Sequence, residues 1–255
     1  MSLLEIDNAS RYFDGLAAVA DVSLAVEKGE LIGLIGPNGA GKTTLFNLIS
    51  GFTPPSAGAI RFAGRTITGR KPHAIARLGM ARTFQNLRIF PNMSVFDNAS
   101  VGATGIVGQP AWNAVFGTRS RAERISERSW AALERTGLAA MAGELAANLS
   151  YGKRKYLEIA RALAMEPDLL VLDEPAAGLN DSETAELAAF IRDLNATGMT
   201  IMLVEHDMTL VMGICRRIVV LASGRKIADG TPDAVRQDPA VLEAYLGTGD
   251  DDDYS

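Results

Sequence analysis

The feature that most constrains the fold is an octapeptide near the start of the chain, Gly36-Pro37-Asn38-Gly39-Ala40-Gly41-Lys42-Thr43. It fits the spacing G-x-x-x-x-G-K-[ST] at every fixed position, the pattern of a loop whose backbone N–H groups surround phosphate. Glycines allow the backbone to turn inward, and a helix that begins near the lysine directs its positive end at the same anion. Such a loop requires a strand before it and a helix after it.

The segments on either side of the loop meet that requirement. Residues 31–35, LIGLI, form a short apolar run typical of a strand buried on both faces. Residues 42–51, KTTLFNLISG, repeat their apolar side chains along one helical face, and Gly51 fits a helix C-cap. The context therefore favours a functional phosphate loop over a chance match, which average residue usage predicts in about 1% of chains of this length.

This loop predicts a nucleotide site that needs ATP and Mg²⁺. Lys42 supplies a charge to the β- and γ-phosphates, Thr43 offers a hydroxyl to Mg²⁺, and Thr44 reaches a further phosphate. The backbone of the loop supplies the remaining phosphate contacts.

The order of the remaining segments predicts an α/β layered sheet with an antiparallel part and a helical sub-domain. Strands alternate with helices through the middle of the chain, as parallel sheets require. The expected strands are residues 3–7, 18–30, 31–35, 81–85, 169–175 and 200–206, with a turn and a strand within 54–64 and a hairpin over 216–230 around Ser223-Gly224. The expected helical parts are residues 42–51, the stretch 94–148, a helix over 151–167 that stops at Pro167, and a helix over 182–198.

Composition excludes several classes of protein. The net charge of −5 leaves no global basic field to hold nucleic acid. One cysteine and two histidines exclude a disulfide framework and a His-rich metal site. The start of the chain lacks the apolar core of a signal peptide, and no run reaches the ~18 apolar residues that span a bilayer. We expect a cytoplasmic, soluble chain that meets a membrane only through a partner.

Polar residues end three of the expected strands. Asp173 and Glu174 end a buried strand, where an aspartate can hold Mg²⁺ and a glutamate can activate water, although Asp173 alone could be a turn cap before a proline. His206 ends another strand and could contact the γ-phosphate or be structural. Gln85 ends the strand ARTFQ and could ligate Mg²⁺ and sense the nucleotide, or be a solvated loop residue.

The segment LSYGKRK (149–155) opens a helix. Ser150 is a good N-cap and Gly152 allows close backbone approach, so in isolation the segment is typical of a capped surface helix. In the order phosphate loop, Gln85, this segment, Asp173-Glu174 and His206, the chain resembles the ATP-binding cassette (ABC) ATPases from about residue 3 to residue 247.

That resemblance implies two nucleotide domains that sandwich two ATP molecules head to tail. Each site would pair one subunit's phosphate loop with Ser150 and Gly152 of the other, in the place of the family's LSGGQ-type signature. The adenine-stacking aromatic maps to Phe13, with Tyr12 as the adjacent candidate and core packing at a strand end as the alternative for both.

The chain departs from the family pattern at three positions. Lys153 replaces the usual signature glutamine, Tyr151 replaces a glycine, and Asn180 stands where the family often has aspartate. These departures mark either a weakened site or a subgroup. The sequence surrounding them is similar to the larger ATPase of branched-chain amino-acid importers, and urea and amide importers share much of that pattern.

The resemblance to importers implies partners and a location. These are a second ABC ATPase (a copy of this chain or a different one), two membrane permease subunits, an extracytoplasmic solute-binding protein, and a place at the cytoplasmic face of the inner membrane. The helical stretch 94–148, together with the segment NLRIFPNMSVFDN at its start, would contact the permeases. The contact residues would be Phe90, Met93, Val95 and Phe96; the alternative is that these four side chains pack internally.

We expect residues 1–247 to form one nucleotide-binding domain, with a helical sub-domain at about 94–167, followed by an acidic tail at 248–255. Other interpretations stay open: a regulatory subunit with weak hydrolysis, a soluble ABC protein of translation or repair, and a small-molecule kinase.

Overall fold

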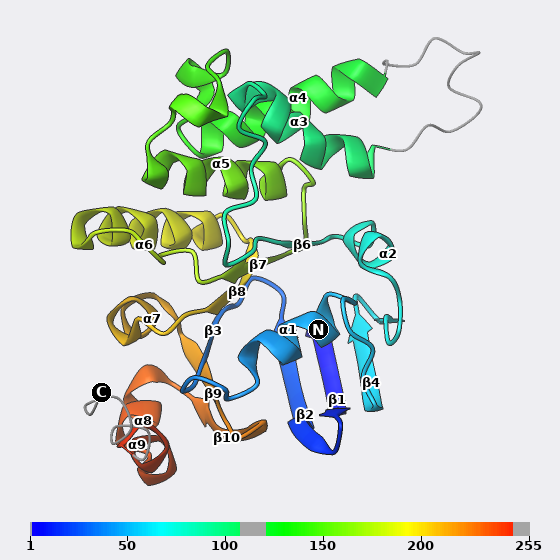
Figure 1. Ribbon diagram of the computed structural model, residues 1–255, viewed down its shortest axis with the longest axis vertical. Coiled ribbons are helices and arrows are strands. Elements are labelled where there is room, and N and C mark those ends of the chain that lie inside the picture. The colour runs from blue at the N-terminus through cyan, green and yellow to red at the C-terminus, as the bar shows by residue number, and fades with distance from the viewer. Residues whose placement is uncertain (1, 108–120, 247–255) are drawn as a thin grey trace.

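The computed structural model describes residues 2–107 and 121–246. A group of helices lies at one end of the long axis and the larger sheet at the centre, while the smaller sheet and a C-terminal helical pair lie at the other end (Figure 1). The strands are β1 (Ser2–Phe13), β2 (Leu16–Glu27), β3 (Leu31–Ile35), β4 (Ala57–Phe62), β5 (Arg65–Thr66), β6 (Met80–Arg82), β7 (Leu169–Asp173), β8 (Thr200–Val204), β9 (Arg217–Ala222) and β10 (Arg225–Gly230). The helices are α1 (Lys42–Ile49), α2 (Pro72–Ala76), α3 (Val95–Ile106), α4 (Arg121–Arg135), α5 (Tyr151–Leu163), α6 (Asp181–Ala196), α7 (Met208–Ile214), α8 (Pro232–Gln237), α9 (Pro239–Leu246) and the 3₁₀ turns η1 (Ala139–Met141) and η2 (Ala146–Asn148).

The larger sheet has the order β10-β9-β3-β8-β7-β6, and the smaller one has the order β2-β1-β4-β5. In the larger sheet only β10 is antiparallel to its neighbour, whereas every pair in the smaller sheet is antiparallel. Strand β3 lies between β9 and β8, so the loop that follows it leaves from the middle of the parallel region. Ligands of open α/β sheets bind at this carboxyl edge.

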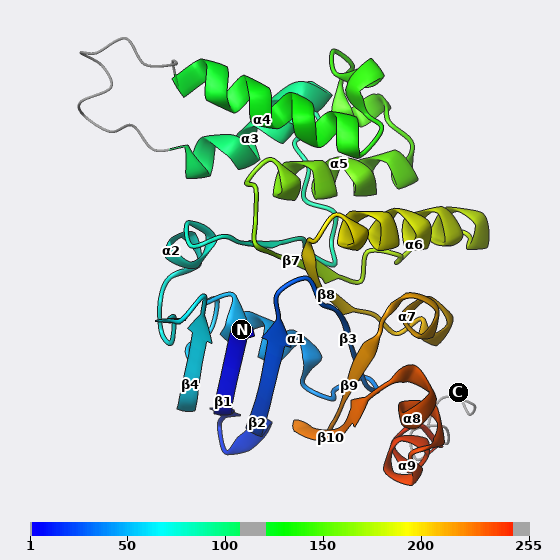
Figure 2. The ribbon, with the colours of Figure 1, turned by 180° about the vertical axis from the view of Figure 1, so that it is seen from behind.

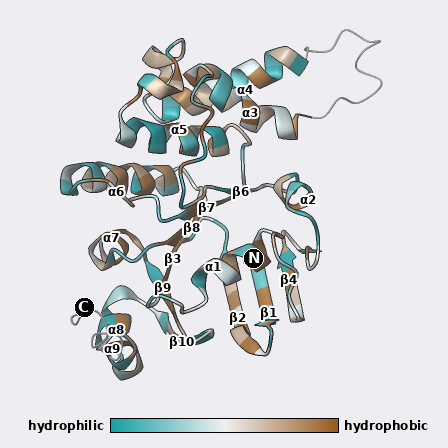
Figure 3. Ribbon diagram, in the orientation of Figure 1, coloured by the Kyte–Doolittle hydropathy of each residue, from teal (hydrophilic) through white to brown (hydrophobic). Residues whose placement is uncertain are grey.

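Successive side chains of the buried strands point to opposite faces of the larger sheet, so one hydrophobic core forms on each face. On β3, Ile32 and Leu34 join the core shared with α1 and the smaller sheet. Leu31 and Ile35 join the second core, which extends to α5, α6 and α7. Figure 3 shows the resulting apolar band through β3, β7 and β8 at the centre of the molecule. The period-2 geometry of a strand explains why a continuous apolar run serves two layers at once.

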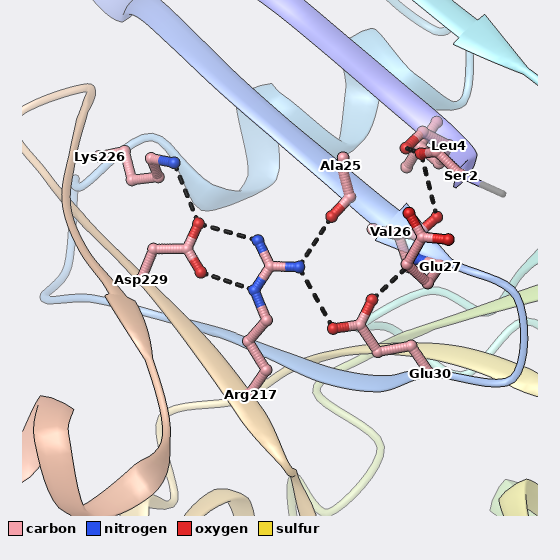
Figure 4. A network of polar contacts seen from close by, with 9 residues as sticks. All are labelled: Ser2, Leu4, Ala25, Val26, Glu27, Glu30, Arg217, Lys226 and Asp229. Carbon is pink, nitrogen blue, oxygen red and sulfur yellow. Dashed lines mark hydrogen bonds and ion pairs between the residues drawn. The ribbon is translucent and has the colours of Figure 1, made fainter.

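A polar network joins the two sheets at one edge (Figure 4). Arg217 of β9 donates to both carboxylate oxygens of Asp229 at 2.6 and 2.9 Å, to the carbonyl oxygen of Ala25 at 2.9 Å and to Glu30 at 3.2 Å. Lys226 donates to the same Asp229 carboxylate at 3.0 Å. Burial alone would raise the pKa of Asp229, but the hydrogen bonds from Arg217 and Lys226 hold it below its ordinary value. A bidentate Arg–carboxylate pair of this kind fixes geometry as well as charge.

Helices α3, α4 and α5 lie together beyond α6, at the end of the molecule farthest from the smaller sheet (Figure 2). Their presence in 94–167 agrees with the helical stretch expected from the sequence. Helix α5 ends at Leu163, four residues before Pro167, because Met165 and Glu166 donate into tight turns and Glu166 takes φ +50°. The backbone thus ends this helix before the proline can, and the expected boundary was wrong.

Two further expectations need correction. Strand β6 ends at Arg82 and does not reach Gln85, because the N–H of Phe84 donates to Glu158 of α5 at 3.3 Å and no longer to the sheet. Val95 is fully buried at the start of α3, so it cannot be a surface contact, whereas Phe90 is exposed and Met93 and Phe96 are half-buried.

Among residues 2–107 and 121–246, no helix combines the length and apolar character needed to cross a membrane. The acidic tail predicted at 248–255 lies outside the described residues.

Candidate functional site

The phosphate loop adopts the conformation that its glycines predicted. Gly36, Gly39 and Gly41 have φ values of +151°, +76° and +97°, in the region that favours glycine. A Cβ at Gly36 would lie 2.1 Å from the carbonyl oxygen of Leu221, and one at Gly41 would lie 2.3 Å from that of Ala18. The glycines at the two fixed positions are therefore required by the close approach of β9 and β2, in addition to any ligand.

The turn of the β9–β10 hairpin touches the loop from one side. The N–H of Gly224 donates to the carbonyl oxygen of Ala40 at 3.1 Å, and the N–H of Ala20 donates to the carbonyl oxygen of Gly224 at 2.8 Å. Ser223 and Gly224 both have positive φ, as a two-residue hairpin turn requires. The predicted hairpin around these residues is confirmed. Its turn is hydrogen-bonded both to the phosphate loop and to β2 of the smaller sheet.

Lys42 begins α1 and folds back over the loop. Its Nζ donates to the carbonyl oxygens of Gly36 and Pro37, at 2.5 and 3.0 Å. Burial lowers the pKa of Lys42, while the nearby carboxylates of Glu174 and Asp173 oppose that shift. The ammonium is thus held beside the loop amides, where a phosphate could take over the two carbonyl contacts.

Glu174 lies just after β7 and meets two of the predicted residues. Its carboxylate accepts from Nε2 of Gln85 at 2.7 Å and lies 3.4 Å from Nδ1 of His206. The residue is 9% exposed and has φ +48°, a conformation that costs energy outside glycine. A buried carboxylate held between an amide and an imidazole suits activation of a water molecule.

A second buried glutamate holds the turn that carries Glu174. Glu205 is 1% exposed, and its carboxylate accepts from the N–H of Ala176 at 2.8 Å. Burial raises the pKa of Glu205. Glu205 was not among the residues predicted from the sequence, although an acid inside the apolar run TIMLVEH was a visible signal.

Asp173, the other member of the acidic pair, is bound by Arg82, which was not among the residues predicted from the sequence either. Arg82 of β6 donates to Asp173 at 2.7 Å, and both side chains are 7% exposed. The same guanidinium donates to Asn47 at 2.9 Å and to Ser50 at 2.8 Å, at the end of α1. Arg82 therefore connects the acidic strand end to the helix that follows the phosphate loop.

The loop that carries Gln85 is attached to α5 through Glu158. This residue is 3% exposed, accepts from the N–H of Phe84, and lies 3.8 Å from Arg161. Burial raises the pKa of Glu158, and the backbone hydrogen bonds and neighbouring cations oppose that shift. A shift of α5 would therefore move Phe84 and, with it, the neighbouring Gln85.

A pocket of about 560 Å³ opens over the loop and collects most of the predicted residues. Its lining includes the predicted residues Asn38, Gly39, Ala40, Gly41, Lys42, Thr43, Thr44, Gln85 and Glu174, together with Leu16–Ala18 of β2 and the hairpin turn. Phe13 is not part of that lining. It is 43% exposed and pairs with Leu16 across the β1–β2 turn, and the guanidinium of Arg11 lies 4.6 Å from its ring centroid.

Ser150 and Gly152 also lie away from this pocket. Ser150 caps α5 by accepting from the N–H of Lys153 at 3.4 Å, and Gly152 packs against α6. In the described residues, these two do not line the phosphate loop's pocket.

The oxygen donors near Lys42 fit a hard cation. Thr43 offers a hydroxyl, Gln85 keeps its amide oxygen while its Nε2 bonds Glu174, and Asp173 keeps one carboxylate oxygen outside its contact with Arg82. Mg²⁺ is bound in proteins through one or two carboxylates with other oxygens. The described residues contain no cluster of three or more His, Cys, Asp or Glu side chains that could form a site richer in carboxylates.

Comparison with known proteins places this geometry in context. A family model described as "ABC transporter" matches residues 19–177, and one described as "Branched-chain amino acid ATP-binding cassette transporter" matches residues 225–251. The chain is 44% identical to the high-affinity branched-chain amino acid transport ATP-binding protein LivG of Salmonella typhimurium, over 96% of this chain and 98% of that one. It is 45% identical to the corresponding protein BraF of Pseudomonas aeruginosa, with the same two shares covered.

The fold is equally close to solved structures. A crystal structure of the ADP conformation of an ATP-binding cassette of an ABC transporter aligns with a TM-score of 0.85 at 32% identity, covering 97% of this chain and 99% of that one. A nucleotide-free cassette from an ABC transporter aligns with a TM-score of 0.84 at the same identity, covering 96% and 99%.

Proposed function

We propose, from the premise that this chain belongs to the ABC transporter family of ATP-binding proteins, that its hydrolysis of ATP drives the import of branched-chain amino acids. The family is that of the model matched over residues 19–177 and of the LivG and BraF relatives, and the chain is an ATPase of this kind with the ABC ATPase fold. The substrate class is the proposed part. It rests on what those relatives are named to transport and on the match at residues 225–251.

One observation supports the proposed chemistry above all others. Lys42, the phosphate loop and Glu174 line a single pocket, and Glu174 is oriented by Gln85 and His206. We assign Glu174 as the base that orients or deprotonates the attacking water, and His206 and Gln85 as groups that position it. Lys42 and the loop amides then stabilise the charge that develops on the transferred phosphoryl group.

Mg²⁺ belongs to the same proposal. Thr43, Gln85 and Asp173 would hold the ion, which when bound would neutralise charge on the phosphates. Arg82 orients the Asp173 carboxylate through a contact of 2.7 Å. The guanidinium of Arg82 thus holds Asp173 at the proposed Mg²⁺ position.

The complete enzyme in this proposal is a dimer. Ser150 and Gly152 would complete the site formed by the phosphate loop of a second copy or of a related ATPase, because neither lines the pocket of its own chain. Phe13 would stack on adenine. Its exposed ring is accessible at the end of β1, although the pocket as it stands does not include it.

The proposed assembly includes two membrane permeases and, through them, an extracytoplasmic solute-binding protein, at the cytoplasmic face of the inner membrane. Residues 1–247 act as one nucleotide-binding domain in this scheme, with the helices of 94–167 as the part that meets the permeases. Phe90 is 45% exposed and is the strongest remaining candidate for that contact.

The deciding experiment is ATP hydrolysis by the purified chain as a function of its concentration, with Glu174→Gln beside it and Glu186→Gln, an exposed carboxylate of α6, as the matched control. We expect a rate per subunit that rises with concentration, is reduced by at least about 10²-fold in Glu174→Gln and is unchanged in Glu186→Gln. Nucleotide binding by Glu174→Gln should persist. Binding without hydrolysis in the unmodified chain would instead indicate a regulatory subunit that requires a partner ATPase.

Substrate class needs a second measurement, because the nucleotide site carries no information on it. Cells that express only the Glu174→Gln chain should lose uptake of labelled leucine. Loss of urea or amide uptake with leucine uptake intact would refute the branched-chain assignment and leave the ATPase assignment standing.

A further inference from the structure

Tyr151, at the first position of α5, contacts the loop that follows Glu174, and the chemistry proposed above makes no use of this contact. Its hydroxyl donates to the carbonyl oxygen of Ala177 at 3.1 Å. Its ring also covers Gly178, where a Cβ would lie 3.0 Å from a ring carbon and 3.1 Å from the hydroxyl oxygen. Gly178 has φ +81°, so a side chain there would be strained as well as crowded. Tyr151 therefore holds this loop by one hydrogen bond and one tight packing contact.

The ring is also approached by Lys155, one turn further along α5. Lys155 is 3% exposed, and its Nζ has no hydrogen-bond partner among the described residues. The ammonium lies 5.7 Å from the centroid of the Tyr151 ring, and it also attracts the carboxylate of Glu158. A buried cation without hydrogen bonds is costly, and a ring face is one of the few groups that can offset that cost. The ring is thus held by Lys155 as well as by Gly178.

Packing between the first turns of α5 and α6 reinforces this arrangement. A Cβ at Gly152 would lie 2.9 Å from Oε1 of Glu183, so the two helices approach closely here and a larger residue would displace the Glu183 carboxylate. Glu183 is itself fixed by a capping box, in which it accepts from the N–H of Asn180 at 3.1 Å and its own N–H donates to the Asn180 side chain at 3.0 Å. Helices α5 and α6 lie side by side in both ribbon views (Figures 1 and 2).

The held loop leads directly to the catalytic glutamate. The N–H of Ala177 donates to the carbonyl oxygen of Glu174 at 3.2 Å, and the N–H of Leu179 donates to that of Ala176 at 3.0 Å. These tight turns transmit a displacement of Ala177 to Glu174 over three residues.

We propose that Tyr151 latches the start of α5 to the loop after Glu174, so that the two segments move as one body when Ser150 meets a nucleotide. This inference rests on the proposed function for the nucleotide, which a second subunit holds. Tyr151 is a positioning residue in this scheme. Because Ser150 and Gly152 act on one nucleotide and Glu174 on the other, the latch makes the two sites of a dimer depend on each other.

Hydrogen exchange of the nucleotide-free protein tests the latch itself. The amides of Ala176, Ala177 and Leu179 all have acceptors, so their exchange reports on the loop. We expect Tyr151→Phe, which loses only the hydroxyl, to speed their exchange about three- to tenfold, the factor that one hydrogen bond accounts for. Tyr151→Gly should speed it further. Tyr156→Phe is the matched control, because Tyr156 lies on the same helix with its ring on Phe190, 5.2 Å between centroids.

Unchanged exchange of this loop in both Tyr151 variants would overturn the proposal. Denaturant unfolding of each variant separates a local change from a general loss of stability, and Tyr151→Phe carries the test alone if Tyr151→Gly does not fold.

The dependence of the ATPase rate on ATP concentration tests the consequence. We expect a Hill coefficient above 1 in the unmodified protein that falls towards 1 in Tyr151→Phe, with the affinity of isolated subunits for nucleotide unchanged. Faster loop exchange with an unaltered Hill coefficient would refute the link between the sites. A rate that is independent of protein concentration in the unmodified chain would refute the proposed dimer instead, and the exchange result would still decide whether the latch exists.

Discussion

The buried pair between Arg82 and Asp173 yields the most demanding prediction on stability. Arg82→Met keeps most of the side-chain volume but removes the charge and every donor. Asp173 would then keep a buried carboxylate without the partner that lies 2.7 Å away, and Asn47 and Ser50 would each lose a donor. The aromatic rings of Phe46, Phe52 and Phe84, with centroids 5.4 to 5.7 Å from the guanidinium carbon, would accept the methionine as an apolar neighbour.

The expected loss follows from those contacts. Removing one partner of a buried ion pair costs about 3–5 kcal/mol, and each orphaned hydrogen bond at α1 adds about 0.5–1.5 kcal/mol. These contributions overlap at one side chain, so we expect Arg82→Met to lose roughly 4–5 kcal/mol in all. At about 2–4 °C per kcal/mol for a domain of this size, the midpoint of thermal unfolding should fall by roughly 10 °C or more.

Denaturant unfolding of four proteins tests this reasoning: the unmodified chain, Arg82→Met, Asp173→Asn and the double variant. The loss of unfolding free energy in the double variant should be smaller than the sum of the two single losses by at least about 1.5 kcal/mol. The reason is that the neutral amide that replaces the Asp173 carboxylate no longer needs a cation. Arg61→Met is the control, since its ion pair with Glu5 is 3.9 Å long and exposed and should be worth less than about 1 kcal/mol. A loss below about 1 kcal/mol in Arg82→Met, or simple additivity, would refute the argument.

Two further predictions concern the catalytic loop and the contact between the sheets. Glu158→Ala removes the acceptor of the Phe84 N–H, so we expect kcat to fall about tenfold with KM little changed; its effect should not add to that of Gln85→Ala, and exposed Glu166→Gln should match the unmodified chain. Asp229 has a lowered pKa in the folded state, so its contribution to stability is present above its unfolded pKa of about 3.9 and is lost as pH falls through the folded value. Urea unfolding from about pH 7 to about pH 3 should therefore show a smaller acid loss in Asp229→Asn, and an identical pH profile would contradict the assignment.

The sequence predicted those parts of the molecule in which a local pattern decides the structure. The phosphate loop requires positive φ at fixed spacings, and the apolar runs around it are compatible with few alternatives, so β3, α1 and the presence of β7 and β8 could be predicted. The expected ends of β7 and β8 were wrong, because these strands end at Asp173 and Val204, two residues earlier than the sequence indicated. The hairpin at Ser223-Gly224 was equally local. Its turn residues specify its geometry whatever surrounds them.

The remaining parts depend on contacts between distant segments. Nothing near Gln85 in the sequence reveals that Glu158, far along the chain, captures the backbone and ends β6 early. The role of Arg82 was hidden for the same reason, because an arginine at the end of an apolar strand is typical of a surface charge until Asp173 is placed beside it. Completion of the site by Ser150 and Gly152 lies outside any single chain, so it stays a prediction.

The hairpin turn at Ser223-Gly224 has a consequence for engineering the chain. Hairpin tips are the usual places to insert a tag or a peptide, because most of them project into solvent. This tip is hydrogen-bonded to Ala20 on one side and to Ala40 on the other, so lengthening it would move the backbone that surrounds the phosphates. The tip between β4 and β5 at Gly64 has no atom within 4 Å of a Cβ placed there. An epitope grafted at Gly64 would leave the nucleotide pocket intact, whereas one grafted at Gly224 would abolish it.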